Sequence, residues 1–359
     1  MDRRQYVSID TFNSKILSSL QCSVIQGSKL SALLYTIYVN EVPKLYNLMG
    51  DTILDNVIGD NKLNNPSIID HVTVQYVDDS NNVITSESSE GVVEYINKYF
   101  KLLEFFYDLN KLRINPDKSK LMVICKPSLR STTNGIVLTT SEYVIEQVQK
   151  VKALGIYITS GLNNHANINN IISKVNYCIA VLREVFRFAD KKTKIILMNA
   201  LVISVFHYGC PLLINSNQKL ISKLQTLLMK CTRHILGFSS YKMSTIAIMK
   251  ELKFLTIQHL IVKESILFIH RVLFNQLPIS IFNLVTYGND DITNVRRVRY
   301  PRMKIQHKSE GVRQSLLNRS IFLLNELGYE FRYYNPKKLS KYLQENIYYI
   351  FPHNKIAKQ

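Results

Sequence analysis

Two adjacent carboxylates, Asp78 and Asp79, lie between two runs of strand-like sequence. Upstream, residues 71–77 alternate between two sets of side chains, and residues 81–84 can return as the partner strand. Such alternation on both sides of Asp, Ser and Asn residues predicts a β-hairpin with the two carboxylates at its tip. Adjacent carboxylates repel each other unless a cation is present, and hard divalent cations prefer oxygen ligands. The pattern therefore indicates a metal site, and the alternative is an ordinary polar turn.

The composition limits the class of protein that carries this hairpin. Hydrophobic residues make up 46% of the 359 residues, which is typical of a folded chain of about two domains. The 45 Lys and Arg residues outnumber the 27 Asp and Glu residues by 18. This excess favours a polyanionic partner, either nucleic acid or an acidic membrane surface. Part of it is local, because residues 290–359 contain 14 basic and 6 acidic residues.

The cysteines and the hydropathy pattern indicate a protein that is not secreted. The five cysteines are scattered and contain no CxxC pair, as expected in a reducing compartment. Cys231 and His234 lie three residues apart, but two ligands do not make a zinc site. No signal-peptide pattern opens the chain, so we expect an intracellular protein, nuclear or cytoplasmic. The uncharged residues 195–218 predict a buried helix that ends near Gly209, and we expect no membrane association.

Several elements are expected around the hairpin. Residues 30–42 have helical spacing, with Ser28 as a potential N-cap and Pro43 expected to end or bend the helix. Residues 91–112 predict a strongly amphipathic helix. The other predicted elements of this half are a polar loop at 50–66, a turn at 115–118, a buried strand at 121–124 and a strand at 153–158.

A change in periodicity near residue 160 predicts a domain boundary. After it the apolar side chains recur at helical spacing almost throughout, and the predicted helices are residues 168–186, 191–208, 218–236 and 257–274. The sequence therefore predicts an α+β fold, with a mixed first part and a helical second part.

Six ordered blocks together resemble the reverse transcriptase of non-LTR (LINE-type, jockey-like) retrotransposons. The blocks are Val24 to Tyr35 with Tyr38 to Pro43, Tyr76-Val77-Asp78-Asp79, Asn115 to Lys120, Leu154-Gly155-Ile156, Ala200 to Gly209, and Leu224-Gln225 with Arg233 to Gly237. The first is similar to that family's "PQGS…LL…YIND-P" segment, with Ile25 in place of the usual Pro. The resemblance spans essentially the whole chain. It implies a polymerase palm at 1–160, a helical thumb-like domain at 161–290 and a basic C-terminal region at 291–359.

The resemblance also implies roles for individual residues. Asp78 would be a direct ligand and Asp79 a second carboxylate of a two-metal Mg²⁺ site. Gln26, Gly27, Ser28 and Tyr76 would bind the templating base and the incoming dNTP, with an RNA template and a DNA primer as the other partners. Lys118 or Lys120 would stabilise or protonate the pyrophosphate, and the alternative for these lysines is a solvated turn. His207 and His234 are interpreted as satisfied core or surface histidines.

The sequence departs from the family pattern at its start. The family carries a further catalytic Asp upstream, but only 25 residues precede Gln26, and Asp2 and Asp10 lack its Phe and Ala neighbours. The run Arg3-Arg4-Gln5-Tyr6-Val7 resembles the segment that follows this Asp. We therefore expect a chain that starts inside the palm, with an incomplete metal site and no activity in isolation. An upstream polymerase fragment could complete it. The alternative function is a non-catalytic nucleic-acid-binding protein derived from a retroelement.

Overall fold

The computed structural model describes residues 29–48, 68–125, 144–237, 242–274, 315–327 and 333–352, together with a few short segments elsewhere. By its internal contacts the chain divides into two units, residues 1–149 and residues 150–359. The described residues are mostly helical, and their strands pair antiparallel in two-stranded sheets. The predicted α+β fold is therefore confirmed. The predicted loop at 50–66 lies outside the described residues.

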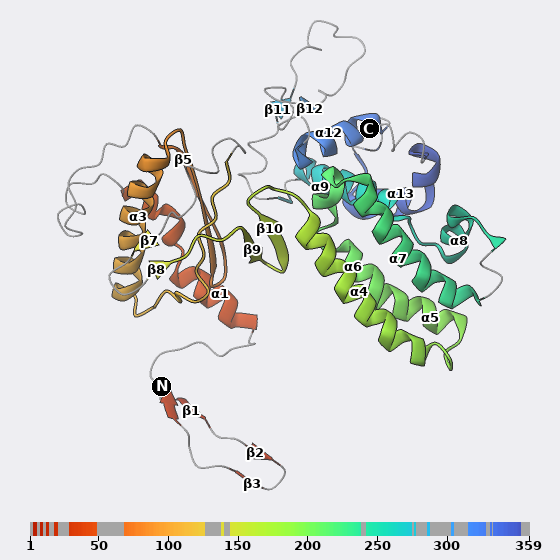
Figure 1. The fold of residues 1–359 in the computed structure, drawn as a ribbon, viewed down its shortest axis with the longest axis horizontal. Coiled ribbons are helices and arrows are strands. Elements are labelled where there is room, and N and C mark those ends of the chain that lie inside the picture. The colour runs from red at the N-terminus through yellow and green to blue at the C-terminus, as the bar shows by residue number, and fades with distance from the viewer. Residues whose placement is uncertain are drawn as a thin grey trace, which may run out of the picture. The chain divides into compact units, whose positions relative to one another are not determined.

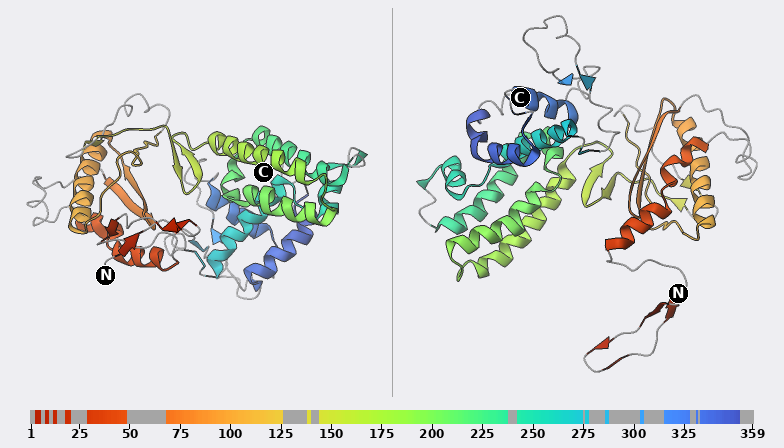
Figure 2. Two further views of the ribbon diagram at one scale, coloured as in Figure 1. Left: turned by 90° about the horizontal axis from the view of Figure 1, so that it is seen from below. Right: turned by 180° about the vertical axis from the view of Figure 1, so that it is seen from behind.

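The first unit is built around one long hairpin and one long helix (Figures 1 and 2). Its main elements are α1 (Lys29–Tyr38), the 3₁₀ helix η1 (Val42–Leu48), β5 (Ile68–Tyr76), β6 (Asp79–Ser86) and α3 (Ser89–Leu109). Short strand pairs join β1 (Arg3–Gln5) to β4 (Ser18–Leu20), β2 (Ser8–Ile9) to β3 (Phe12–Asn13), and β7 (Leu138–Thr139) to β8 (Val144–Ile145). The hairpin and the helices predicted at 30–42 and 91–112 are thereby confirmed.

The core of the first unit lies between α3 and the segment that follows α1. Buried side chains of both form one cluster, which consists of Val39, Val42, Leu45, Tyr99, Leu102 and Leu103. Ser88 begins α3 as an N-cap, because its side chain accepts a hydrogen bond from the backbone N–H of Gly91. The helix α1 ends at Tyr38, before Pro43, and Pro43 is instead the second residue of η1.

Two predicted strands differ in the structure. The prediction of a buried strand at 121–124 is wrong, because Leu121 makes only an isolated β-bridge to Gln147 and Ile124 is 51% exposed. The strand predicted at 153–158 is two strands, β9 (Lys150–Ala153) and β10 (Ile156–Thr159). Leu154 and Gly155 form the two-residue turn between them, with φ of 47° and 82°. Positive φ at both positions is typical of a tight hairpin turn, and the glycine adopts it without steric cost.

The second unit is a helical assembly in which α4, α6 and α7 lie near one another in both ribbon views (Figures 1 and 2). Its helices are α4 (His165–Val185), α5 (Lys191–Met198), the π-helical turn η3 (Asn199–Ile203), α6 (Ser204–His207), the 3₁₀ helix η4 (Cys210–Asn215), α7 (Gln218–Leu236), α8 (Thr245–Leu252), α9 (Ile257–Leu273), α12 (Leu316–Glu326) and α13 (Pro336–Ile350). The strands β11 (Thr286–Tyr287) and β12 (Met303–Lys304) form a short pair. The four helical regions predicted from periodicity are confirmed, although a π-helical turn interrupts the second.

The uncharged residues 195–218 form part of this assembly. The helix ends at His207, and Gly209 follows in the left-handed conformation with φ of 67°. Among the described residues, no helix is long and apolar enough to cross a membrane.

Candidate active site

The two carboxylates lie where the hairpin turns. Tyr76 at the end of β5 pairs with Asp79 at the start of β6, so Val77 and Asp78 form the two-residue turn. Both carboxylates are exposed. Val77 has a φ of 55°, which is a genuine outlier for a β-branched residue. Such strain persists only where the surrounding structure determines it, and it is concentrated at functional sites.

A polar network fastens the hairpin to α3. The side-chain oxygen Oδ1 of Asn82 accepts hydrogen bonds from Thr73 Oγ1 at 2.7 Å and from Tyr99 OH at 3.1 Å. His71 Nε2 lies 3.4 Å from the same oxygen, and His71 Nδ1 lies 3.0 Å from Tyr95 OH. These contacts join both strands of the hairpin to two tyrosines of α3, and they hold the base of the strands that carry the carboxylates.

The contacts define the tautomer of a neutral His71. Because Asn82 Oδ1 can only accept, His71 Nε2 is the donor, and Nδ1 then accepts from the hydroxyl of Tyr95. Burial lowers the pKa of His71 below its ordinary value, although the hydrogen bond to Asn82 and the charge of Asp70 act in the opposite direction. The imidazole is only 6% exposed, and its ring contacts Tyr99 edge-on with centroids 4.4 Å apart.

The opposite face of the hairpin is apolar and exposed. The large side chains on it are Val72, Val74, Tyr76 and Val83. Tyr76, which the family resemblance places against the substrate, is 62% exposed on this face. The strands therefore turn their polar face toward α3, and the large apolar side chains of the other face are 41% to 62% exposed.

The structure brings α1 close to the turn of the hairpin. Burial raises the pKa of the Tyr35 hydroxyl, and the negative charge of Asp78 raises it further. Tyr35 belongs to the first of the six sequence blocks, so a residue of that block feels the charge of a carboxylate of the second. Burial, with the neighbouring Tyr35 and Tyr99, also raises the pKa of Tyr107 to about 12. Tyr35 and Tyr107 therefore stay protonated at neutral pH.

The other predicted site residues are placed only in part. Lys118 is exposed in the predicted turn, where its backbone N–H donates to Asn115 Oδ1 at 3.3 Å. Within the described part of the chain, no ion pair joins its ammonium group to Asp78 or Asp79. Gln26, Gly27, Ser28 and Asp10 lie outside the described residues.

The donor set fits Mg²⁺ in type. Asp78 and Asp79 offer the carboxylate oxygens that this cation prefers, and both side chains are open to solvent. Among the residues that the structure describes, no group of three or more His, Cys, Asp or Glu side chains could hold a metal ion. The described residues thus contribute two carboxylates to a metal site.

The second unit joins two of the quoted blocks. The Tyr208 hydroxyl donates a hydrogen bond to the carbonyl oxygen of Leu154 in the β9–β10 turn. A methyl group on Gly209 would lie 2.8 Å from Ile156 Cδ1, so a glycine allows the close approach. Separately, His207 Nδ1 lies 3.3 Å from Oε1 of Glu264 in α9, and the contact is an ion pair when the imidazole is protonated.

Sequence reasoning missed His71, Asn82 and Glu264 as site or network residues. His71 and Asn82 lie on the polar face of the predicted strands, and no sequence signal marked that face as the one that packs on a helix. For Glu264 the signal was its place as the only acidic residue of a helical run rich in apolar side chains.

A hairpin with paired carboxylates at its turn, packed on an amphipathic helix, is an arrangement suited to metal-dependent nucleotidyl transfer. Residues 4–158 match the family described as reverse transcriptase (RNA-dependent DNA polymerase). The chain therefore contains a reverse transcriptase domain, which covers somewhat less than half of its length. In comparisons with curated proteins and with solved structures, nothing matches the chain.

Proposed function

We propose that this chain is the RNA-directed DNA polymerase region of a non-LTR retroelement, with Asp78 and Asp79 as its metal-binding carboxylates. The observation that carries the proposal is the β5–β6 turn, which presents both carboxylates within a reverse transcriptase domain. The order of the six sequence blocks supports the non-LTR class. The proposed organisation is a palm at 1–160, a thumb-like domain at 161–290 and a basic region at 291–359.

In this proposal the protein mainly positions the reactants. The two-residue turn fixes the directions of Asp78 and Asp79, and the network around Asn82 fixes the strands behind them. The chemistry that Mg²⁺ supplies when bound is to lower the pKa of the attacking hydroxyl and to neutralise the leaving pyrophosphate. Gln26, Gly27, Ser28 and Tyr76 would bind the template base and the dNTP, and Lys118 the pyrophosphate. Positioning provides most of the rate in phosphoryl transfer, so a rigid hairpin is the main requirement.

Primer extension tests the polymerase. The whole chain is given an RNA template, a DNA primer, dNTPs and Mg²⁺, and is compared with the variants Asp78→Asn and Asp108→Asn. Asp108 is an exposed carboxylate of α3 and serves as the matched control. Extension that disappears in Asp78→Asn alone supports the proposal. We expect no extension by the isolated chain, so metal binding needs a separate measurement.

Paramagnetic broadening by Mn²⁺ tests the carboxylates without requiring activity. We expect Mn²⁺ to broaden the amide signals of residues 76–80 in the wild-type chain and in Asp108→Asn, but not in a double Asp78→Asn, Asp79→Asn variant. Broadening without extension supports a metal-binding hairpin in a catalytically incomplete domain. If neither extension nor selective broadening occurs, the proposed site is wrong.

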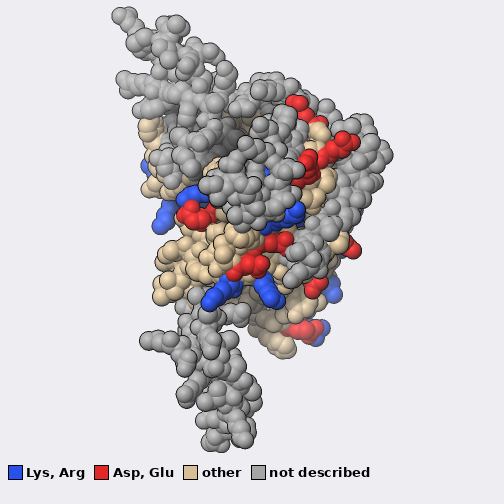
Figure 3. Space-filling model, turned by 90° about the vertical axis from the view of Figure 1, so that its left-hand side faces the viewer, with Lys and Arg blue, Asp and Glu red and all other residues tan. Residues whose placement is uncertain are grey.

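A second candidate function is non-catalytic binding of nucleic acid, favoured by a basic stripe on α7. The stripe consists of Lys219, Lys223, Lys230 and His234, all exposed. Intervals of four, seven and four residues place them on one side of the helix, over roughly 22 Å at 1.5 Å per residue. The helix contains no acidic residue. By contrast, acidic and basic side chains are interspersed on the face of the molecule that Figure 3 shows.

The salt dependence of binding tests this stripe. Each phosphate contact contributes a slope of about −0.9 in log K against log salt for duplex DNA. Replacing Lys219, Lys223 and Lys230 by Gln should therefore make the slope less steep by about 2 to 3. The control variant replaces Lys191, Lys192 and Lys194 of α5, which changes the net charge equally. Equal effects of both variants would show that only net charge matters, and would exclude a specific role of the stripe.

A further inference from the structure

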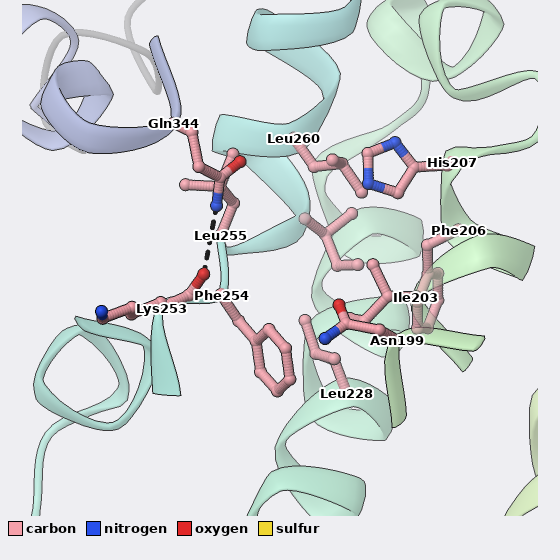
Figure 4. Close-up of a pocket in the computed structure, with 11 residues that line it drawn as sticks. Asn199, Ile203, Phe206, His207, Leu228, Lys253, Phe254, Leu255, Leu260 and Gln344 are labelled. Carbon is pink, nitrogen blue, oxygen red and sulfur yellow. Dashed lines mark hydrogen bonds between the residues drawn. The ribbon is translucent and has the colours of Figure 1, made fainter. Parts of the chain in front are cut away.

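A cavity of about 170 Å³ lies in the second unit, where the π-helical turn η3 faces the start of α9 and the side of α13 (Figure 4). Its floor is apolar and buried, and consists of Phe206, Leu228, Phe254, Leu255, Ile257 and Leu260. Its rim is polar, and consists of Asn199, His207, Lys253 and Gln344, with the partly buried Ile203 between them. An apolar floor with a few polar groups at the mouth is the usual construction of a small-molecule site.

The π-helical turn shapes one wall of this cavity. Asn199 and Ile203 are its first and last residues, and both line the cavity. Asn199 Nδ2 donates to the carbonyl of Ile195 at 3.0 Å, and Ser204 Oγ donates to the carbonyl of Ala200 at 2.6 Å. Side chains thus bind carbonyls around the widened turn. Turns of this kind are found frequently at functional sites.

Two acceptor atoms face the cavity. The Glu264 side chain is 19% exposed. Burial raises the pKa of its carboxyl group. The hydrogen bond and charge of His207, together with the charges of Lys263 and Arg271, outweigh this effect and hold the pKa below its ordinary value. When the His207 ring is neutral, the proton on Nδ1 faces the Glu264 carboxylate and Nε2 is an acceptor, which points toward the apolar side chains in Figure 4. Asn199 Oδ1 is the second acceptor, because its amide nitrogen is bound to Ile195.

The Gln344 side chain on the rim of the cavity is already satisfied. Gln344 Nε2 donates to the carbonyl of Lys253 at 3.1 Å, and Gln344 Oε1 accepts from the buried Lys263 at 2.9 Å. These two hydrogen bonds fix the orientation of the Gln344 side chain. Within the described residues, neither His207 Nε2 nor Asn199 Oδ1 accepts a hydrogen bond from the protein, and both residues are exposed, so a ligand that donates a hydrogen bond can replace water there.

We propose that this cavity binds a small phenol, with the ring on the apolar floor and the hydroxyl donating to His207 Nε2 or Asn199 Oδ1. The volume of the cavity is sufficient for one aromatic ring, since an engineered apolar cavity of about 150 Å³ in another protein binds benzene. The proposal concerns the second unit alone and does not depend on polymerase activity.

The test titrates the whole chain, labelled with ¹³C at the Ile and Leu methyl groups, with phenol and separately with toluene. Toluene has nearly the same shape but no donor. We expect phenol to saturate with a millimolar dissociation constant, to shift the methyl signals of Ile203, Leu228 and Leu260, and to bind up to about tenfold more tightly than toluene. The preference for phenol should fall to near unity in the double variant His207→Ala, Asn199→Ala.

Two further variants make the outcome decisive. Ile203→Phe, which fills the partly exposed wall, should abolish the methyl shifts, while His165→Ala, an exposed histidine on α4, should change nothing. The proposal is overturned if phenol binding does not saturate, if toluene binds as tightly as phenol, or if the preference survives removal of both acceptors. Circular dichroism of each variant shows that it is folded.

Discussion

Replacing Asn82 by Ala should loosen the hairpin that carries the two carboxylates. The substitution removes the oxygen that accepts from Thr73 at 2.7 Å, from Tyr99 at 3.1 Å and from His71 at 3.4 Å. Tyr99 is 2% exposed and His71 is buried, so both lose an acceptor for a largely buried donor, whereas Thr73 is only half-buried. An unsatisfied buried donor costs about 1–3 kcal/mol. Because the His71 contact is long, we expect a total loss of about 2–4 kcal/mol.

Native-state hydrogen exchange measures this loss for the hairpin itself. The free energy of opening of the amides in residues 68–86 should fall by that amount in Asn82→Ala. The matched control is Asn81→Ala, because Asn81 is the exposed neighbour that pairs with Val74 and makes none of these contacts. Its effect should stay within about 0.5 kcal/mol.

An Asn82→Asp variant keeps the acceptor oxygens and separates hydrogen bonding from packing. We expect it to retain more protection than Asn82→Ala. If Asn82→Ala and Asn81→Ala loosen the hairpin equally, the network does not hold it, and the explanation of how the carboxylates are positioned is wrong.

Two other predictions concern His71 of the hairpin network and Gly209 of the second unit. The pKa of His71 in the folded state lies below its ordinary value of 6.5, so the unfolded chain binds the proton more readily. The stabilisation from neutral His71 should be complete above pH 6.5 and fall as the pH drops toward the folded pKa, and exchange of the hairpin in His71→Phe should lack this component. Gly209→Ala should lower the stability of the second unit by about 1–3 kcal/mol through its positive φ and the contact with Ile156 Cδ1. Adding Ile156→Val, which removes that atom, should restore part of the loss in thermal unfolding.

Local patterns were sufficient for most of the elements. The helix α3 could be predicted because its apolar side chains recur at helical spacing and Ser88 caps it. The hairpin could be predicted because alternation meets a short polar turn. The prediction of a strand at 121–124 failed because an apolar run does not show whether a partner strand is available to pair with it. The prediction of one continuous strand at 153–158 failed because the two-residue turn with positive φ at Leu154 and Gly155 was not recognised.

The sequence by itself determined the class of the hairpin and its place in a reverse transcriptase domain, because residue types at fixed spacing carry that information along the chain. Only the tertiary structure decided which face of the hairpin is buried. Alternation defines two faces, but the hydroxyls of Tyr95 and Tyr99 on α3 select the polar one by offering it hydrogen bonds. The pairing of His207 with Glu264, and the cavity beside it, likewise depend on side chains 57 residues apart that are brought together by packing.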